Sequence, residues 1–141
     1  MQSKSPFVEH VQRLLDEEGF GSSRLLSLDG GDEGESAIFE IDGLVFRAVR
    51  DRAQGFLDIG TTDRPNEFHQ FDDVALALGW STIESVLQRN EPEPLHSVIK
   101  QIREHFDGMR REMTGSTGEI TRARIHRANA ARTAAIANKL R

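Results

Sequence analysis

The dipeptide Asp42-Gly43 limits the folds open to this chain more than any other feature of its sequence. Both central residues of a type I′ turn need a positive φ, and an aspartate followed by a glycine adopts that conformation at little cost. Residues 37–41 and 44–50 on either side are rich in β-branched and aromatic side chains, which favour strands. The sequence therefore predicts a β-hairpin closed by the Asp42-Gly43 turn.

Turn-forming residues extend this hairpin into an antiparallel meander. Residues 51–55 form a second turn that leads to a third strand over 56–60, and a short strand is expected at 25–28. The stretch DGGDEGES at 29–36 precedes the hairpin. Its acidic residues would repel a phosphate, and their spacing does not match a calcium-binding loop, so we expect a solvated turn.

Helix signals lie on both sides of the meander. Before it, Ser5 is a suitable cap, Pro6 suits the first helical position, and Gly19 ends the apolar pattern. After it, the apolar residues over 71–78 predict a short helix. Residues 81–84 (STIE) fit a capping box, with Ser81 as the cap of another short helix.

The C-terminal part of the chain is also expected to be helical. Residues 95–113 carry apolar side chains at steps of three and four, which predicts one amphipathic helix of about five turns. Residues 116–119 fit a further capping box. Residues 120–141 are rich in Ala and Arg and have high helix propensity. This last segment is expected to extend from the body, to dock on it, or to become ordered on contact with a partner.

The order of these elements predicts an α+β fold. We expect an N-terminal helix, an antiparallel meander of three to four strands, short helices, one long amphipathic helix and a C-terminal basic helix. Residues 1–113 are expected to form a single α+β domain, followed by a basic, Ala/Arg-rich helical tail over 114–141.

Charge divides the chain at the same boundary. Residues 1–113 hold 12 Lys and Arg against 22 Asp and Glu, whereas residues 114–141 hold six basic residues and one acidic residue, so the net charge of −5 hides two opposite segments. An acidic body repels nucleic acid and is steered toward basic protein surfaces. Six basic residues without interleaved aromatic side chains make a weak nucleic-acid footprint, so the sequence argues against such a partner.

Composition excludes several classes of protein. Of the 141 residues, 37% are hydrophobic and 29% are charged, which permits a modest core and argues against global disorder. The absence of cysteine excludes a disulfide framework, a thiolate metal site and a cysteine nucleophile. No apolar run could span a bilayer, and the first residues lack the apolar core of a secretory signal. We expect a soluble cytoplasmic protein without a membrane partner.

The sequence shows no pattern of catalytic or metal-binding residues. The histidines at positions 10, 69, 96, 105 and 126 lack the spacing that places two imidazoles on one helix face. No GxSxG elbow accompanies the serines. We therefore predict no catalytic residue, no metal site and no cofactor. An enzyme with an unrecognised site would need a pocket that converges on His69, Asp72 or Arg50.

Arg47, Arg50, Asp51 and Arg52 form the densest mixed-charge cluster. Their guanidinium groups could hold a carboxylate or a phosphate of a partner. They could also belong to a polar strand face and its turn, and we favour this interpretation because surface ion pairs are common.

Two segments resemble a known family. FRAVRDRAQGFLDIGTT over 46–62 and FHQFDDVALALGW over 68–80 look like small bacterial immunity proteins of contact-dependent growth inhibition and related polymorphic-toxin systems. Those proteins carry a strand, an arginine-aspartate turn, an acidic strand that ends in glycine, and an aromatic residue before an apolar helix with a Leu-Gly stop. The basic segment after Thr114 lies outside this pattern.

The resemblance implies a bound partner rather than a reaction. Such a protein neutralises its cognate toxin C-terminal domain, usually a nuclease, by stoichiometric contact. A nuclease needs a basic active-site cleft for phosphate, and an acidic body would be steered to it. The contact residues we expect are acidic residues that loops can carry into a cleft: Asp29, Asp32, Glu33, Glu35, Asp63, Glu67, Asp72 and Asp73.

Two alternatives stay open at this point. One is a nucleic-acid-associated regulatory module that uses the basic tail through Arg122, Arg124, Arg127 and Arg132. The other is an adaptor whose exposed tail docks on another protein chain.

Overall fold

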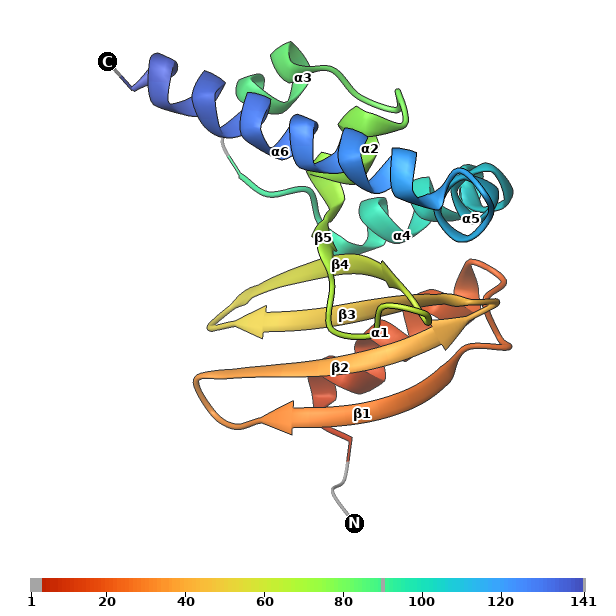
Figure 1. Cartoon of the computed structure of the whole chain (residues 1–141). Helices are drawn as coiled ribbons and strands as arrows, with labels where there is room; N and C mark the ends of the chain where they lie inside the picture. Colours follow the sequence, from red (N-terminus) through yellow and green to blue (C-terminus); the bar gives the residue numbers. More distant parts are fainter. Residues whose placement is uncertain (1–3, 90, 141) are drawn as a thin grey trace.

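A five-stranded antiparallel sheet forms one layer of the fold, and each strand pairs with the next along the chain (Figure 1). The computed structural model describes residues 4–89 and 91–140. The sheet confirms the predicted meander and adds a short fifth strand that the sequence did not predict. The strands are β1 (Arg24–Gly30), β2 (Gly34–Ile41), β3 (Leu44–Asp51), β4 (Gln54–Thr61) and β5 (His69–Gln70).

The turn between β2 and β3 has the predicted geometry. Asp42 and Gly43 have φ values of 49° and 86°, which are the two positive angles that a type I′ turn requires. Ile41 and Leu44 are therefore paired directly across the turn. Since side chains alternate between the two faces of a strand, this register decides which residues of β2 and β3 enter the core.

One face of the sheet forms the hydrophobic core. Helix α1 (Pro6–Glu17) packs on it and begins where the Ser5 hydroxyl accepts a hydrogen bond from the Val8 N–H at 3.2 Å. Helix α4 (Leu95–Glu104) packs beside α1 and against β4. The strand side chains that belong to the core cluster alternate along the sequence: Ala37, Phe39, Ile41, Leu44, Phe46, Ala48, Leu57 and Ile59.

The helix predicted over 95–113 is interrupted at His105, which separates α4 from α5 (Phe106–Thr114). His105 has a φ of −112°, and its imidazole stacks on the indole of Trp80 with the ring centroids 4.5 Å apart. The interruption lets α4 pack against the sheet while α5 packs against α6 (Gly118–Lys139). The apolar spacing of three and four continues across the break, so the sequence pattern gave no sign of it.

The two short helices after the sheet are close to the prediction. They are α2 (Phe71–Ala77) and α3 (Ile83–Gln88). The cap of α3 is Thr82, whose hydroxyl oxygen accepts a hydrogen bond from the Ser85 N–H at 3.2 Å, so the prediction of Ser81 as the cap was wrong by one residue.

Helix α6 docks on the body instead of extending from it. It packs against α2 and α5 (Figure 1), and Ile125 is only 1% exposed within the common core. The capping box predicted over 116–119 does not form. The cap position is Thr117 instead of Ser116, and the Thr117 hydroxyl makes no cap bond but donates to the Glu112 carbonyl at 3.1 Å. None of the described helices combines the length and apolar character needed to cross a membrane.

Replacing Gly43 with alanine should lower the free energy of unfolding by about 1–2 kcal/mol, because a Cβ strains a residue at positive φ. Gly21 is the matched control, since neither glycine has an atom within 4 Å of an added Cβ and only Gly43 has a positive φ. Gly21→Ala should change the stability by no more than about 0.5 kcal/mol. Urea unfolding of both variants measures these changes. An equal loss of stability in the two variants would show that the positive φ of Gly43 is not the cause.

Candidate functional site

Residues 29–35, here called the acidic turn, comprise the end of β1, the connection over 31–33 and the start of β2. Arg50 of β3 holds this turn in shape. The Arg50 guanidinium donates hydrogen bonds to the carbonyls of Gly31 at 2.8 Å and Arg52 at 2.9 Å, and longer ones to the carbonyl of Asp32 at 3.3 Å. These bonds join two neighbouring turns through one planar group, whose fixed donor geometry suits such a role. The structural interpretation of the mixed-charge cluster is therefore confirmed for Arg50.

The acidic side chains of this turn fall into two groups. Asp29, Asp32 and Glu33 are exposed, and within the described chain no ion pair involves them. Glu35 is half-buried, because its carboxylate accepts a hydrogen bond from the Ser5 hydroxyl and lies 3.5 Å from Arg50. Glu35 thus anchors the turn, while the other three present carboxylates to solvent.

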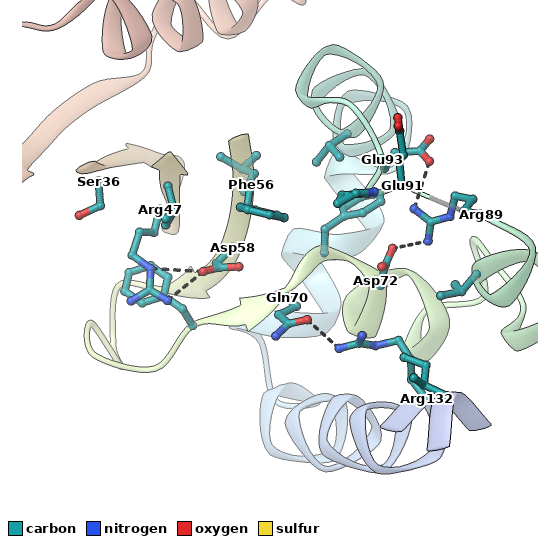
Figure 2. A pocket seen from close by; sticks show the side chains of 18 residues that line it. Ser36, Arg47, Phe56, Asp58, Gln70, Asp72, Arg89, Glu91, Glu93 and Arg132 are labelled. Carbon is teal, nitrogen blue, oxygen red and sulfur yellow. Dashed lines mark hydrogen bonds and ion pairs between the residues drawn. The ribbon is translucent and has the colours of Figure 1, made fainter. Parts of the chain in front are cut away.

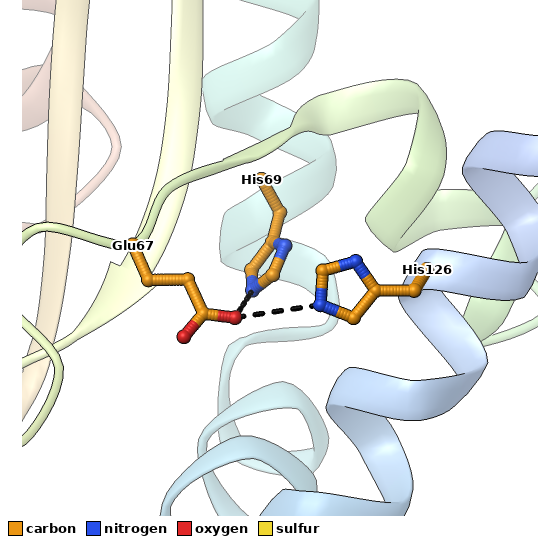
Figure 3. Close-up of side chains that lie close together, drawn as sticks. All are labelled: Glu67, His69 and His126. Carbon is orange, nitrogen blue, oxygen red and sulfur yellow. Dashed lines mark ion pairs between the residues drawn. The ribbon is translucent and has the colours of Figure 1, made fainter.

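Two predicted contact residues lie in the segment between β4 and β5. Asp63 is exposed, and a hydrogen bond from the Thr61 hydroxyl lowers the pKa of its carboxyl, which keeps it ionised near neutral pH. Glu67 instead points toward two imidazoles (Figure 3): its Oε1 lies 3.7 Å from Nε2 of His69 and 3.5 Å from Nε2 of His126.

The two carboxylates at the start of α2 are already hydrogen-bonded to other side chains of the protein. Asp72 accepts a hydrogen bond from Arg89 at 2.7 Å. Asp73 is only 3% exposed, and its carboxylate accepts hydrogen bonds from Arg132 at 2.7 Å and from Asn129 at 2.8 Å. The prediction of Asp73 as a partner contact is therefore wrong in this structure, because the carboxylate faces α6 instead of solvent.

The four arginines of α6 do not form one continuous basic stripe. Arg132 bonds Asp73, and this hydrogen bond raises the pKa of its guanidinium. Arg124 donates to the carbonyl of Ala77 in α2. Arg122 is half-buried, and only Arg127 is fully exposed. Half of the set proposed for nucleic acid thus holds α6 on the body.

A groove of about 880 Å³ lies between the outer face of the sheet, the start of α2, the segment 91–93 and α6 (Figure 2). Arginines in its wall are paired with carboxylates: Arg47 lies 2.8 Å from Asp58, and Arg89 lies 3.2 Å from Glu93. The groove includes Asp72 but is lined by neither His69 nor Arg50. One of the three residues named for an unrecognised enzyme site thus lines this groove, and Arg50 lines two smaller hollows.

The cluster of Glu67, His69 and His126 was missed by sequence analysis. His69 lies in β5 and His126 in α6, far apart along the chain, and only the docking of α6 brings their rings within 5.5 Å of each other. His69 is buried, and this burial is the main cause that lowers the pKa of its imidazole. The only local indication of the cluster was the spacing Glu67-x-His69, and this spacing is too common in proteins to indicate a site.

No family model matches this chain, and no curated protein or solved structure is significantly similar to it. The resemblance to immunity proteins therefore rests on the segments 46–62 and 68–80 alone. In the structure these segments form most of β3 and β4, together with β5 and α2.

The bond between Arg132 and Asp73 should be essential for the docking of α6. Arg132→Met should lower the free energy of unfolding by about 3 kcal/mol, because it leaves a buried carboxylate without its charged partner. Arg127→Met removes the same charge from an exposed position of the same helix and should cost less than about 0.5 kcal/mol. Urea unfolding measures the loss of stability in both variants. Similar losses would show that the buried ion pair stabilises the fold no more than an exposed arginine does.

Proposed function

We propose that this protein is a cytoplasmic immunity protein, which binds the C-terminal domain of a cognate toxin and neutralises it by stoichiometric contact without catalysis. The toxin domain would be a nuclease with a basic active-site cleft. The resemblance of segments 46–62 and 68–80 motivates this proposal, and the surface of the molecule supports it.

The observation that carries the proposal is the acidic turn at 29–35. Arg50 holds its backbone through the carbonyl groups of Gly31 and Asp32 and ties it to the carbonyl of Arg52 in the next turn, so the acidic turn has a defined shape before any partner arrives. A preordered loop loses little conformational entropy on binding. Asp32 and Glu33 at its tip are exposed, and such a tip is complementary to a cleft that binds phosphate.

Docking of α6 strengthens the acidic character of the remaining surface. Arg132 and Arg124 are engaged with Asp73 and a carbonyl of α2, so their donors are not presented to an outside phosphate. The basic segment then acts chiefly as part of the fold. This arrangement supports a basic protein partner over nucleic acid.

The direct test is co-expression with the protein encoded immediately upstream of this one, followed by size exclusion at moderate salt. The proposal expects a one-to-one complex and expects that the neighbouring protein is toxic when it is expressed alone. Binding to a nucleic-acid column in place of such a complex would favour the regulatory module with the basic tail.

A charge reversal tests the acidic turn itself. Asp32→Lys combined with Glu33→Lys should weaken the complex by about tenfold or more, mostly through a slower association rate. Asp16→Lys combined with Glu17→Lys is the matched control, since these exposed neighbours lie at the end of α1 and change the net charge equally. Surface plasmon resonance compares the two, and equal weakening would show that only net charge matters.

A further inference from the structure

We propose that Glu67, His69 and His126 form a binding site for one Zn²⁺ ion, with a fourth coordination position open to solvent. The site is distinct from the acidic turn, and the inference does not depend on the proposed immunity function. It rests on the convergence of three donor atoms from β5, the segment before it and α6 (Figure 3).

The spacing of the donors is the first argument. The two Nε2 atoms lie 3.7 and 3.5 Å from Oε1 of Glu67, and the three ligand atoms all lie within 4.8 Å of one another. These separations exceed the range of about 2.7–3.2 Å for a good N–H···O hydrogen bond. Bonds of about 2.0–2.1 Å in a tetrahedral zinc site place the ligand atoms about 3.3 Å apart. The two distances from the carboxylate to the imidazoles are therefore long for direct hydrogen bonds and close to the spacing that one zinc ion imposes.

The chemistry of the donors selects the class of metal. Two imidazoles and one carboxylate suit Zn²⁺, whereas Mg²⁺ and Ca²⁺ prefer sites made of oxygen ligands alone. Three protein ligands with a free fourth position are typical of zinc sites that hold a water or an outside ligand. The side chain of His126 is 65% exposed, so the site opens to solvent on that side.

The residues around the cluster constrain two of its three ligand side chains, His69 and Glu67. His69 is buried, so the packing around its ring limits the directions in which Nε2 can point. Arg64 approaches the other oxygen of Glu67, Oε2, at 3.5 Å and leaves Oε1 facing the rings.

Bound zinc would connect parts of the chain that are distant in sequence. Glu67 and His69 belong to the edge of the sheet, and His126 belongs to the middle of α6. The ion would thus hold α6 beside β5 in addition to the bond between Asp73 and Arg132. Because metal binding to the folded state alone stabilises that state, zinc should raise the unfolding temperature.

Calorimetric titration of the full-length chain, free of any polyhistidine tag, with zinc chloride near neutral pH tests the proposal. We expect one Zn²⁺ per chain and a rise in the unfolding temperature, whereas Mg²⁺ should produce neither. His126→Ala removes a ligand, and Glu67→Gln replaces the charged carboxylate with a neutral amide that coordinates zinc weakly. Each should therefore weaken zinc binding by more than tenfold. Circular dichroism confirms that both variants remain folded.

His96→Ala is the matched control, because His96 is an exposed histidine outside the cluster. It should bind zinc as the unmodified chain does. Titration with Co²⁺ gives a second readout, in which four-coordinate binding produces strong visible absorption that His126→Ala should abolish. The proposal is overturned by an absence of zinc binding, by unchanged binding in His126→Ala and Glu67→Gln, or by an equal loss in His96→Ala.

Discussion

The buried carboxylate of Asp73 is the point on which the helical half of the molecule depends. It accepts hydrogen bonds from Arg132 and Asn129, and so attaches α6 to α2. A charge this deeply buried is costly unless it is paired, so the two helices have one strongly preferred arrangement. The same arrangement buries Ile125 and places His126 beside Glu67.

The parts of the fold that the sequence predicted are those determined over a few neighbouring residues. The Asp42-Gly43 turn needs only its own backbone angles, and Ser5 caps a helix whose first N–H groups lie next to it. The sequence could not predict the break at His105, because the apolar spacing continues across it and the stacking of His105 on Trp80 is a contact between distant parts of the chain. The short strand β5 likewise exists only because it pairs with β4.

In the candidate site, too, the sequence predicted local features and missed those that depend on long-range packing. The exposed acidic turn was predicted because its composition is local, and the structure adds the reason for its fixed shape. Asp73 was misjudged because the identity of an acidic residue does not tell whether it faces solvent or a neighbouring helix. The cluster around Glu67 depends entirely on long-range packing, since His126 arrives from the last helix. The proposed zinc site therefore depends on how α6 docks, whereas the acidic turn does not.

The way Arg50 holds the β1–β2 turn has a consequence for evolution. Apart from the Glu35 carboxylate 3.5 Å away, its guanidinium contacts carbonyl oxygens of residues 31, 32 and 52, which every amino acid possesses. The side chains of Asp32 and Glu33 at the tip can therefore be exchanged with little cost to the shape of the loop. A hairpin of this kind can acquire a new binding specificity in single mutational steps while its scaffold remains unchanged.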